Sequence, residues 1–147
     1  MFNIVKLQLE HLQELAKEPD NDHLRAWFES THARAMADAE ETVAGFVNDE
    51  LMVVAGLTPY WKGRAYLWCT FSIKAKMNFV PVFRGIFRYM QESPYRRIEM
   101  DVPLDLKHTA VAMRRAEMLG FVMECHRAKY YRPGGGDSAL YSWTKET

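Results

Sequence analysis

The segment from residue 42 to residue 102 constrains the fold of this chain more than any other part. Its first half, residues 42–73, is rich in β-branched and aromatic side chains and is interrupted at Asn48-Asp49-Glu50 and at residues 59–63. Such runs between Asn, Asp, Pro and Gly breaks predict strands joined by short turns. The three predicted strands of this antiparallel meander are residues 42–47, 51–57 and 65–73.

A helix and a fourth strand follow the meander. Residues 77–93 gather apolar side chains on one side of a predicted helix, and residues 96–102 alternate between an apolar and an acidic face. The apolar side chains of this strand are Ile98, Met100 and Val102, and the acidic ones are Glu99 and Asp101. Two strands joined by one helix normally run parallel. The crossover at 65–102 is therefore expected to supply one parallel pair in an otherwise antiparallel sheet.

The remaining segments complete an α/β (α+β) fold with the predicted order β-α-α-β-β-β-α-β-α-β-β. The other strands are residues 2–7, 121–132 and 138–145, and the other helices are residues 9–18, 23–41 and 106–121. Asp22 is expected to cap the second helix. The apolar stripe of that helix would include Leu24, Trp27 and Phe28. Gly120 is expected to end the last helix in the left-handed conformation.

Length and charge narrow the class of protein. At about 100–200 residues per domain, 147 residues indicate one domain, residues 1–147. The formal net charge is zero, which argues against nucleic acid or an anionic membrane as the main partner. The charge is uneven, because residues 1–58 carry 11 acidic and 4 basic groups, a net charge of −7, and the remainder carries +7.

Cysteine usage and hydropathy predict a cytoplasmic protein without a metal site. Cys69 and Cys125 form no CxxC pattern, so neither a disulfide framework nor a metal cluster is expected. No run reaches the about 18 apolar residues of a membrane span, and the N-terminus lacks the layout of a signal peptide.

The order of elements resembles that of the GNAT family of N-acetyltransferases. In that family the helix after the fifth strand typically contains an Ala and ends on Gly-Phe, and Ala112 and Gly120-Phe121 fit that spacing. The last hairpin is also similar, with Tyr130-Tyr131, Gly136-Asp137 and Leu140-Tyr141. The resemblance covers the whole chain in element order and about residues 65–145 in motif. It implies the GNAT fold, acetyl-CoA as cofactor and an amine as acetyl acceptor.

The resemblance also implies a cofactor loop, which the family builds from glycines and backbone N–H groups at a helix N-terminus. Arg84-Gly85 looks locally like this loop, but Arg84 lies only 18 residues before Val102, too few for a helix that crosses the sheet. The family spacing instead places the loop at 74–79, where no glycine occurs. The implied cofactor residues are Phe71, Ser72, Ile73, Lys74, Lys76, Met77 and Asn78, with Thr109 and with Arg114 on the 3′-phosphate.

The family's usual catalytic tyrosine is absent, so other residues must be considered for its role and for the general base. Ala116 stands at the family's usual tyrosine position and cannot donate a proton. Glu99 and Asp101 lie on a strand expected to be covered on both faces, so they are candidates for a general base or an ammonium anchor. The alternative is a salt bridge to Arg84, Arg96, Arg97 or Arg127. Tyr131 is the candidate acid, and its alternative is aromatic packing, as for Tyr130 and Tyr141.

Two functions follow from these observations. The first is an acyl-CoA-dependent N-acyltransferase of non-standard type, with a CoA sensor as a weaker variant. The second follows from the glycine-poor loop and the strand Tyr66-Leu67-Trp68-Cys69, which resemble GNAT-like proteins of tailed bacteriophages, including the internal virion protein A family of T7-type podophages. That resemblance implies a non-catalytic virion-associated or accessory protein, with phage structural proteins as partners, in the host cytoplasm or the virion. An oligomer is compatible with both.

Overall fold

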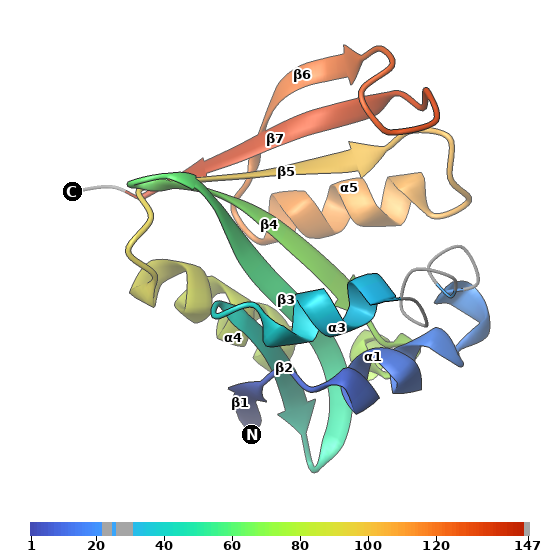
Figure 1. Cartoon of the computed structure of the whole chain (residues 1–147), viewed down its shortest axis with the longest axis vertical. Helices are drawn as coiled ribbons and strands as arrows, with labels where there is room; N and C mark the ends of the chain where they lie inside the picture. Colours follow the sequence, from blue (N-terminus) through green and yellow to red (C-terminus); the bar gives the residue numbers. More distant parts are fainter. Residues whose placement is uncertain (22–24, 26–30, 146–147) are drawn as a thin grey trace. The chain divides into compact units, whose positions relative to one another are not determined.

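The structure is a computed structural model that describes residues 1–21, 25 and 31–145 (Figure 1). The strands are β1 (Phe2–Lys6), β2 (Thr42–Val47), β3 (Glu50–Trp61), β4 (Arg64–Phe71), β5 (Arg97–Pro103), β6 (Val122–Ala128) and β7 (Ser138–Thr144). The helices are α1 (Leu9–Ala16), α3 (Thr31–Asp38), α4 (Phe79–Glu92) and α5 (Thr109–Met118), with 3-10 turns η1 (Pro19–Asn21) and η2 (Ile73–Met77). The predicted cap Asp22 and the stripe residues Leu24, Trp27 and Phe28 lie outside the described residues.

The seven strands form a sheet in the order β1-β2-β3-β4-β5-β7-β6. Neighbours β1–β2, β2–β3, β5–β7 and β6–β7 are antiparallel. β4 and β5 are parallel, with Arg64 beside Arg97 and Tyr66 beside Glu99. The predicted crossover and its parallel pair are therefore confirmed. None of the described helices is long and apolar enough to cross a membrane.

The chain divides into two compact units, which are described in turn. The first comprises residues 1–58 and 68–86, and the second comprises residues 59–67 and 87–147. In the first unit, α1 packs beside α3, and Leu12 and Leu15 of α1 are fully buried in its core. The helical spacing of leucines in the sequence marks that buried side.

Gly85 lies inside α4, where a glycine lowers helix stability in general. A Cβ atom at this position would overlap the ring of Phe2 from β1. The same ring lies against Gly45 of β2. The two glycines thus make room for one aromatic side chain of the N-terminal strand.

Replacing Gly85 with alanine should lower the free energy of unfolding by about 1–3 kcal/mol, because overpacking against Phe2 outweighs the better helix propensity of alanine. Urea unfolding measures the change. Combining it with Phe2→Ala should give less destabilisation than the sum of the two single changes, since the overlap is removed. A fully additive result would show that Phe2 does not oppose a side chain at position 85.

In the second unit, α5 contacts β5 (Figure 1) and ends at the cap that the sequence predicts. Gly120 has φ +93°, and its N–H donates to the carbonyl of Glu117 at 3.0 Å. The N–H of Phe121 donates to the carbonyl of Ala116 at 3.0 Å. These two bonds form a Schellman motif, in which glycine takes the left-handed position without steric cost.

Several predicted boundaries are wrong, among them the end of the strand predicted at 121–132, which as β6 ends at Ala128. β3 continues through the expected break and ends at Trp61, because Gly63, at φ +87°, lets the chain reverse within the short turn at Lys62-Gly63. β4 ends at Phe71 rather than at residue 73, because the Ser72 side chain caps η2. The last helix begins at Thr109 instead of residue 106.

Candidate functional site

The loop after β4 belongs to the first unit and forms η2 where the family spacing places the cofactor loop. Its first donors already have partners. The N–H of Ile73 donates to Oε1 of Glu18 at 2.8 Å, and the Ser72 hydroxyl donates to Oε2 of Glu18 at 2.7 Å. The N–H of Lys74 donates to the Ser72 Oγ at 3.1 Å, and that of Ala75 to the Ser72 carbonyl at 3.0 Å.

The side chains in and after this loop are not typical of a phosphate-binding site. Met77 is 88% exposed, and Phe79 and Val80 at the start of α4 are about half exposed. Pro81, in the first turn of α4, brings no N–H group. Among the other predicted cofactor residues, Lys74 pairs with Glu50 at 3.1 Å, the Asn78 amide donates to the Lys74 carbonyl at 3.3 Å, and the Phe71 ring packs on Phe83.

These residues do not fit the pyrophosphate of acetyl-CoA. Glycines permit the close backbone approach that a pyrophosphate needs, and this loop contains none. The carboxylate of Glu18 takes the N–H of Ile73 and places a negative charge at the start of the loop. A phosphate brought beside this charge would be repelled.

The predicted cofactor residues outside the loop, Thr109 and Arg114, belong to the second unit. The Thr109 hydroxyl lies 2.7 Å from the carbonyl of Pro103 and 2.9 Å from that of Leu106. It therefore fixes the start of α5. Arg114 is exposed on the surface of the same helix.

Glu99 of β5 lies in a chain of ion pairs within the second unit. Its carboxylate accepts from the Nε and Nη2 of Arg64, the latter at 2.8 Å, and from the Nε of Arg97 at 2.9 Å. Arg97 also donates to both carboxylate oxygens of Glu124. Hydrogen bonds from Arg64, and then from Arg97, hold the pKa of Glu99 below its ordinary value. Glu99 is thus an anion suited to positioning two arginines, and a weak base.

Asp101, two residues further along β5, is held by hydroxyl groups. Tyr66 of β4 donates to its Oδ1 at 2.6 Å, and Ser138 of β7 donates to its Oδ2 at 2.8 Å. Burial, with the negative charge of Asp101, strongly raises the pKa of Tyr66. The same two causes raise the pKa of the half-exposed Tyr131. The structure therefore brings Asp101 and Tyr131, two predicted catalytic residues, into one electrostatic environment.

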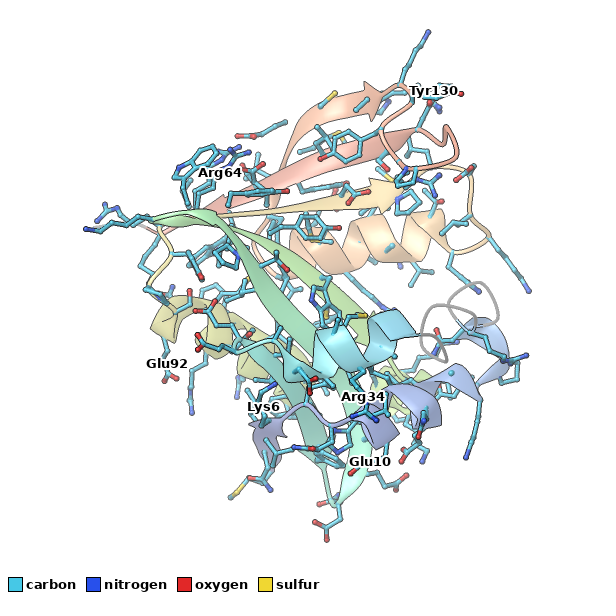
Figure 2. The ribbon with its side chains drawn as sticks, in the orientation of Figure 1. Lys6, Glu10, Arg34, Arg64, Glu92 and Tyr130 are labelled. Carbon is cyan, nitrogen blue, oxygen red and sulfur yellow. The ribbon has the colours of Figure 1, made fainter. Side chains whose placement is uncertain are left out.

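The other two tyrosines of the last hairpin are placed differently. Tyr130 is 82% exposed, at a positive φ of 55°, in the segment after β6 (Figure 2). Tyr141 is buried on β7, and within the described part of the chain its hydroxyl has no hydrogen-bond partner. Burial, with the negative charge of Glu117, raises the pKa of Tyr141.

Sequence reasoning missed four residues that shape these sites: Glu18, Arg64, Tyr66 and Ser138. Of the arginines expected to pair with the β5 carboxylates, Arg97 does so with Glu99. Arg64 was not among them, because its contact with Glu99 depends on the parallel register of β4 and β5. Glu18 carried no local signal, since its partners are 54 and 55 residues away.

Among the described residues, no group of three or more His, Cys, Asp or Glu side chains is arranged to hold a metal ion.

Comparisons with known proteins show likeness in structure. Neither the family models nor the curated proteins that were compared match the sequence. Among solved structures, a GNAT-family acetyltransferase from Bacillus anthracis is similar, with a TM-score of 0.72, 14% identity, and coverage of 97% of this chain and 94% of that one. An N-acetyltransferase from Staphylococcus aureus also has a TM-score of 0.72, with 14% identity and coverage of 98% and 97%.

A third similar structure is the microcin C7 self-immunity acetyltransferase MccE in complex with acetyl-CoA and AMP. It has a TM-score of 0.69 and 12% identity, and the match covers 98% of this chain and 92% of that one. At these identities the likeness concerns the fold.

Proposed function

From the premise that this chain has the GNAT fold, we propose that it is a non-catalytic GNAT-like protein that binds another protein instead of acetyl-CoA. The observation that carries this proposal is the Glu18 carboxylate, which accepts from the N–H of Ile73 and from the Ser72 hydroxyl. An internal anion serves the start of the loop in place of a phosphate group. The chain keeps the GNAT fold, and the Glu18 side chain occupies the hydrogen-bond donors at the start of the loop.

Two further features support the proposal. Ala116, at the family's tyrosine position, is fully buried and has no proton to donate. Glu99 is held by two arginines and has a lowered pKa, so it is a weak base at neutral pH. The glycine-poor loop and the strand at 66–69, which resemble GNAT-like phage proteins, support a role in a virion or beside one, with phage structural proteins as the proposed partners.

Acetyl-CoA should not raise the melting temperature of the protein. A ligand present at 100 times its Kd adds about 2.7 kcal/mol of stability, which for a chain of this size raises Tm by at least about 5 °C. Thermal unfolding with millimolar acetyl-CoA would thus detect a Kd of about 10 μM or tighter. A shift of that size would contradict the proposal, and free adenosine at the same concentration is the control for unspecific effects.

A second candidate function, N-acyl transfer to an amine, is favoured by the hydroxyl-bonded Asp101 and by Tyr131, whose pKa is raised by burial and by the charge of Asp101. Here Asp101 would hold or deprotonate the amine. The candidate requires a thermal shift with acetyl-CoA and, in addition, release of free thiol when amines are supplied. Loss of thiol release in Asp101→Asn, with the shift retained, would support a transferase. Binding without any thiol release would indicate a sensor.

A further inference from the structure

Two carboxylates lie on one face of β5 in the second unit, and the first of them already holds a guanidinium group. Glu99 accepts two hydrogen bonds from Arg64. The central carbon of the Arg64 guanidinium lies 4.6 Å from the ring centroid of Tyr60 and 4.3 Å from that of Trp61. A carboxylate with nearby aromatic faces stabilises a guanidinium by ion pairing and by cation–π attraction. Figure 2 shows Arg64 at the start of β4.

The second carboxylate repeats this geometry without the cation. Arg64 lies beside Arg97 in the parallel pair, and its side chain reaches Glu99, two residues further along β5. Tyr66 lies beside Glu99, and its hydroxyl reaches Asp101, again two residues further. Tyr66 therefore bonds Asp101 from the same relative position on β4 from which Arg64 bonds Glu99. It brings a neutral hydroxyl where Arg64 brings a positive charge.

The hydrogen bonds to Asp101 leave it able to accept more. Tyr66 and Ser138 each donate one hydrogen bond, one to each carboxylate oxygen. An ionised carboxylate has about four acceptor positions, so two hydroxyl donors occupy about half of them. Both donors are neutral, so neither balances the charge of Asp101. The ring of Tyr131 is about half exposed and supplies an aromatic surface open to solvent, and burial followed by the negative charge of Asp101 raises the pKa of its hydroxyl.

We infer that Asp101, Tyr66 and Tyr131 form a binding site for the guanidinium group of an arginine side chain that a partner protein presents. The inference rests on the proposed function, because it names the chemistry by which a partner protein is recognised. The chain's own Arg64, with Glu99, Tyr60 and Trp61, is the internal example of the same recognition. A guanidinium fits this site better than a compact ammonium, since its planar fork pairs with a carboxylate while its face stacks on a ring.

The test compares two small probes that differ in charge and share their shape. Argininamide carries the guanidinium, and citrulline amide replaces it with a neutral ureido group. Both are titrated into the ¹⁵N-labelled full chain and followed by NMR. Argininamide should shift the amide signals of Tyr66, Asp101 and Tyr131, with at least tenfold tighter binding than citrulline amide. Equal binding of the two probes, or shifts confined to other residues, would overturn the inference.

A pair of variants locates the charge responsible. Asp101→Asn keeps the shape of the side chain and removes its charge, and it should weaken argininamide binding at least tenfold. Asp105→Asn is the matched control, because the Asp105 carboxylate already pairs with Arg132 in the same unit, and it should bind argininamide as the unmodified chain does. Undiminished binding by a folded Asp101→Asn variant would contradict the site. If that variant fails to fold, the comparison of probes on the unmodified chain decides alone.

The argininamide and acetyl-CoA experiments can contradict the arginine site and the proposed function separately. A thermal shift with acetyl-CoA would contradict the non-catalytic function and leave the charge preference at Asp101 as measured. Equal binding of argininamide and citrulline amide would remove the arginine site and leave the loop held by Glu18, and with it the proposed function, in place.

Discussion

Replacing Glu18 with alanine should lower the free energy of unfolding by about 3 kcal/mol. The change removes the acceptor of two charge-assisted hydrogen bonds, from the N–H of Ile73 and from the Ser72 hydroxyl, and such bonds contribute about 1.5–3 kcal/mol each. Glu18 is partly exposed, so solvent weakens both hydrogen bonds. The expected loss of stability is therefore well below twice the upper value for one bond. Urea unfolding at pH 7 measures it.

The control for this prediction is Glu14→Ala, an exposed glutamate of α1 in the same unit. An exposed substitution of this kind should change stability by at most about 0.5 kcal/mol. Glu18→Gln should fall between the two, because its amide oxygen still accepts one hydrogen bond without a charge. If Glu18→Ala were no more destabilising than Glu14→Ala, the carboxylate would not hold the loop, and the main support for the proposed function would be lost.

Replacing Glu99 with glutamine should lower the free energy of unfolding at pH 7 by about 1–3 kcal/mol. The carboxylate is about four-fifths buried and accepts from two arginines. Removing its charge leaves Arg64 without its ion-pair partner and leaves Arg97 with Glu124 alone. Glutamine is nearly isosteric, so the loss reports the charge and its hydrogen bonds rather than a cavity. Urea unfolding again gives the difference.

The same variant should change how stability depends on pH. In the folded state, arginine donors lower the pKa of Glu99, so the unfolded chain binds more protons at this group. Its contribution is therefore fully present above the ordinary glutamate pKa of about 4.3 and is lost as the pH falls through the folded-state value. The stability difference between the unmodified chain and Glu99→Gln should be constant from pH 7 to 5 and shrink below pH 4. A difference that stays the same at pH 3 would contradict a lowered pKa, and Glu117→Gln on α5 serves as the exposed control.

The order of elements could be predicted because it depends on local patterns. Strand-like runs and leucines at helical spacing need no knowledge of distant residues, and Gly120 fits its left-handed cap through its own backbone freedom. The end of β3 was missed for a related reason. Pro59 and Gly63 both read as breaks, yet only the second produces a positive φ and reverses the chain.

The candidate sites were predictable in part. The spacing of strand and helix predicted a connection at 74–79, and η2 and the start of α4 lie there. The partners of the loop and of the carboxylates were not predictable, because they come from other segments. Glu18 meets Ser72 across 54 residues, and Tyr66 meets Asp101 across 35. Such contacts depend on the register of a parallel pair and on the packing of a helix end, which no local pattern specifies.

The contact between Phe2 and Gly85 has a consequence for how the chain is made. In the first unit, Phe2 near the N-terminus packs against Gly85 of α4, and Gly85 lies one residue before the end of this unit at residue 86. At about 5–20 residues per second, a ribosome needs roughly 4–17 seconds to add the 83 residues from Asn3 to Gly85. During that interval the Phe2 side chain is without its α4 neighbour, although β1 can already pair with β2. The N-terminal strand therefore remains incompletely packed during this interval, and a chaperone has that time to act on it.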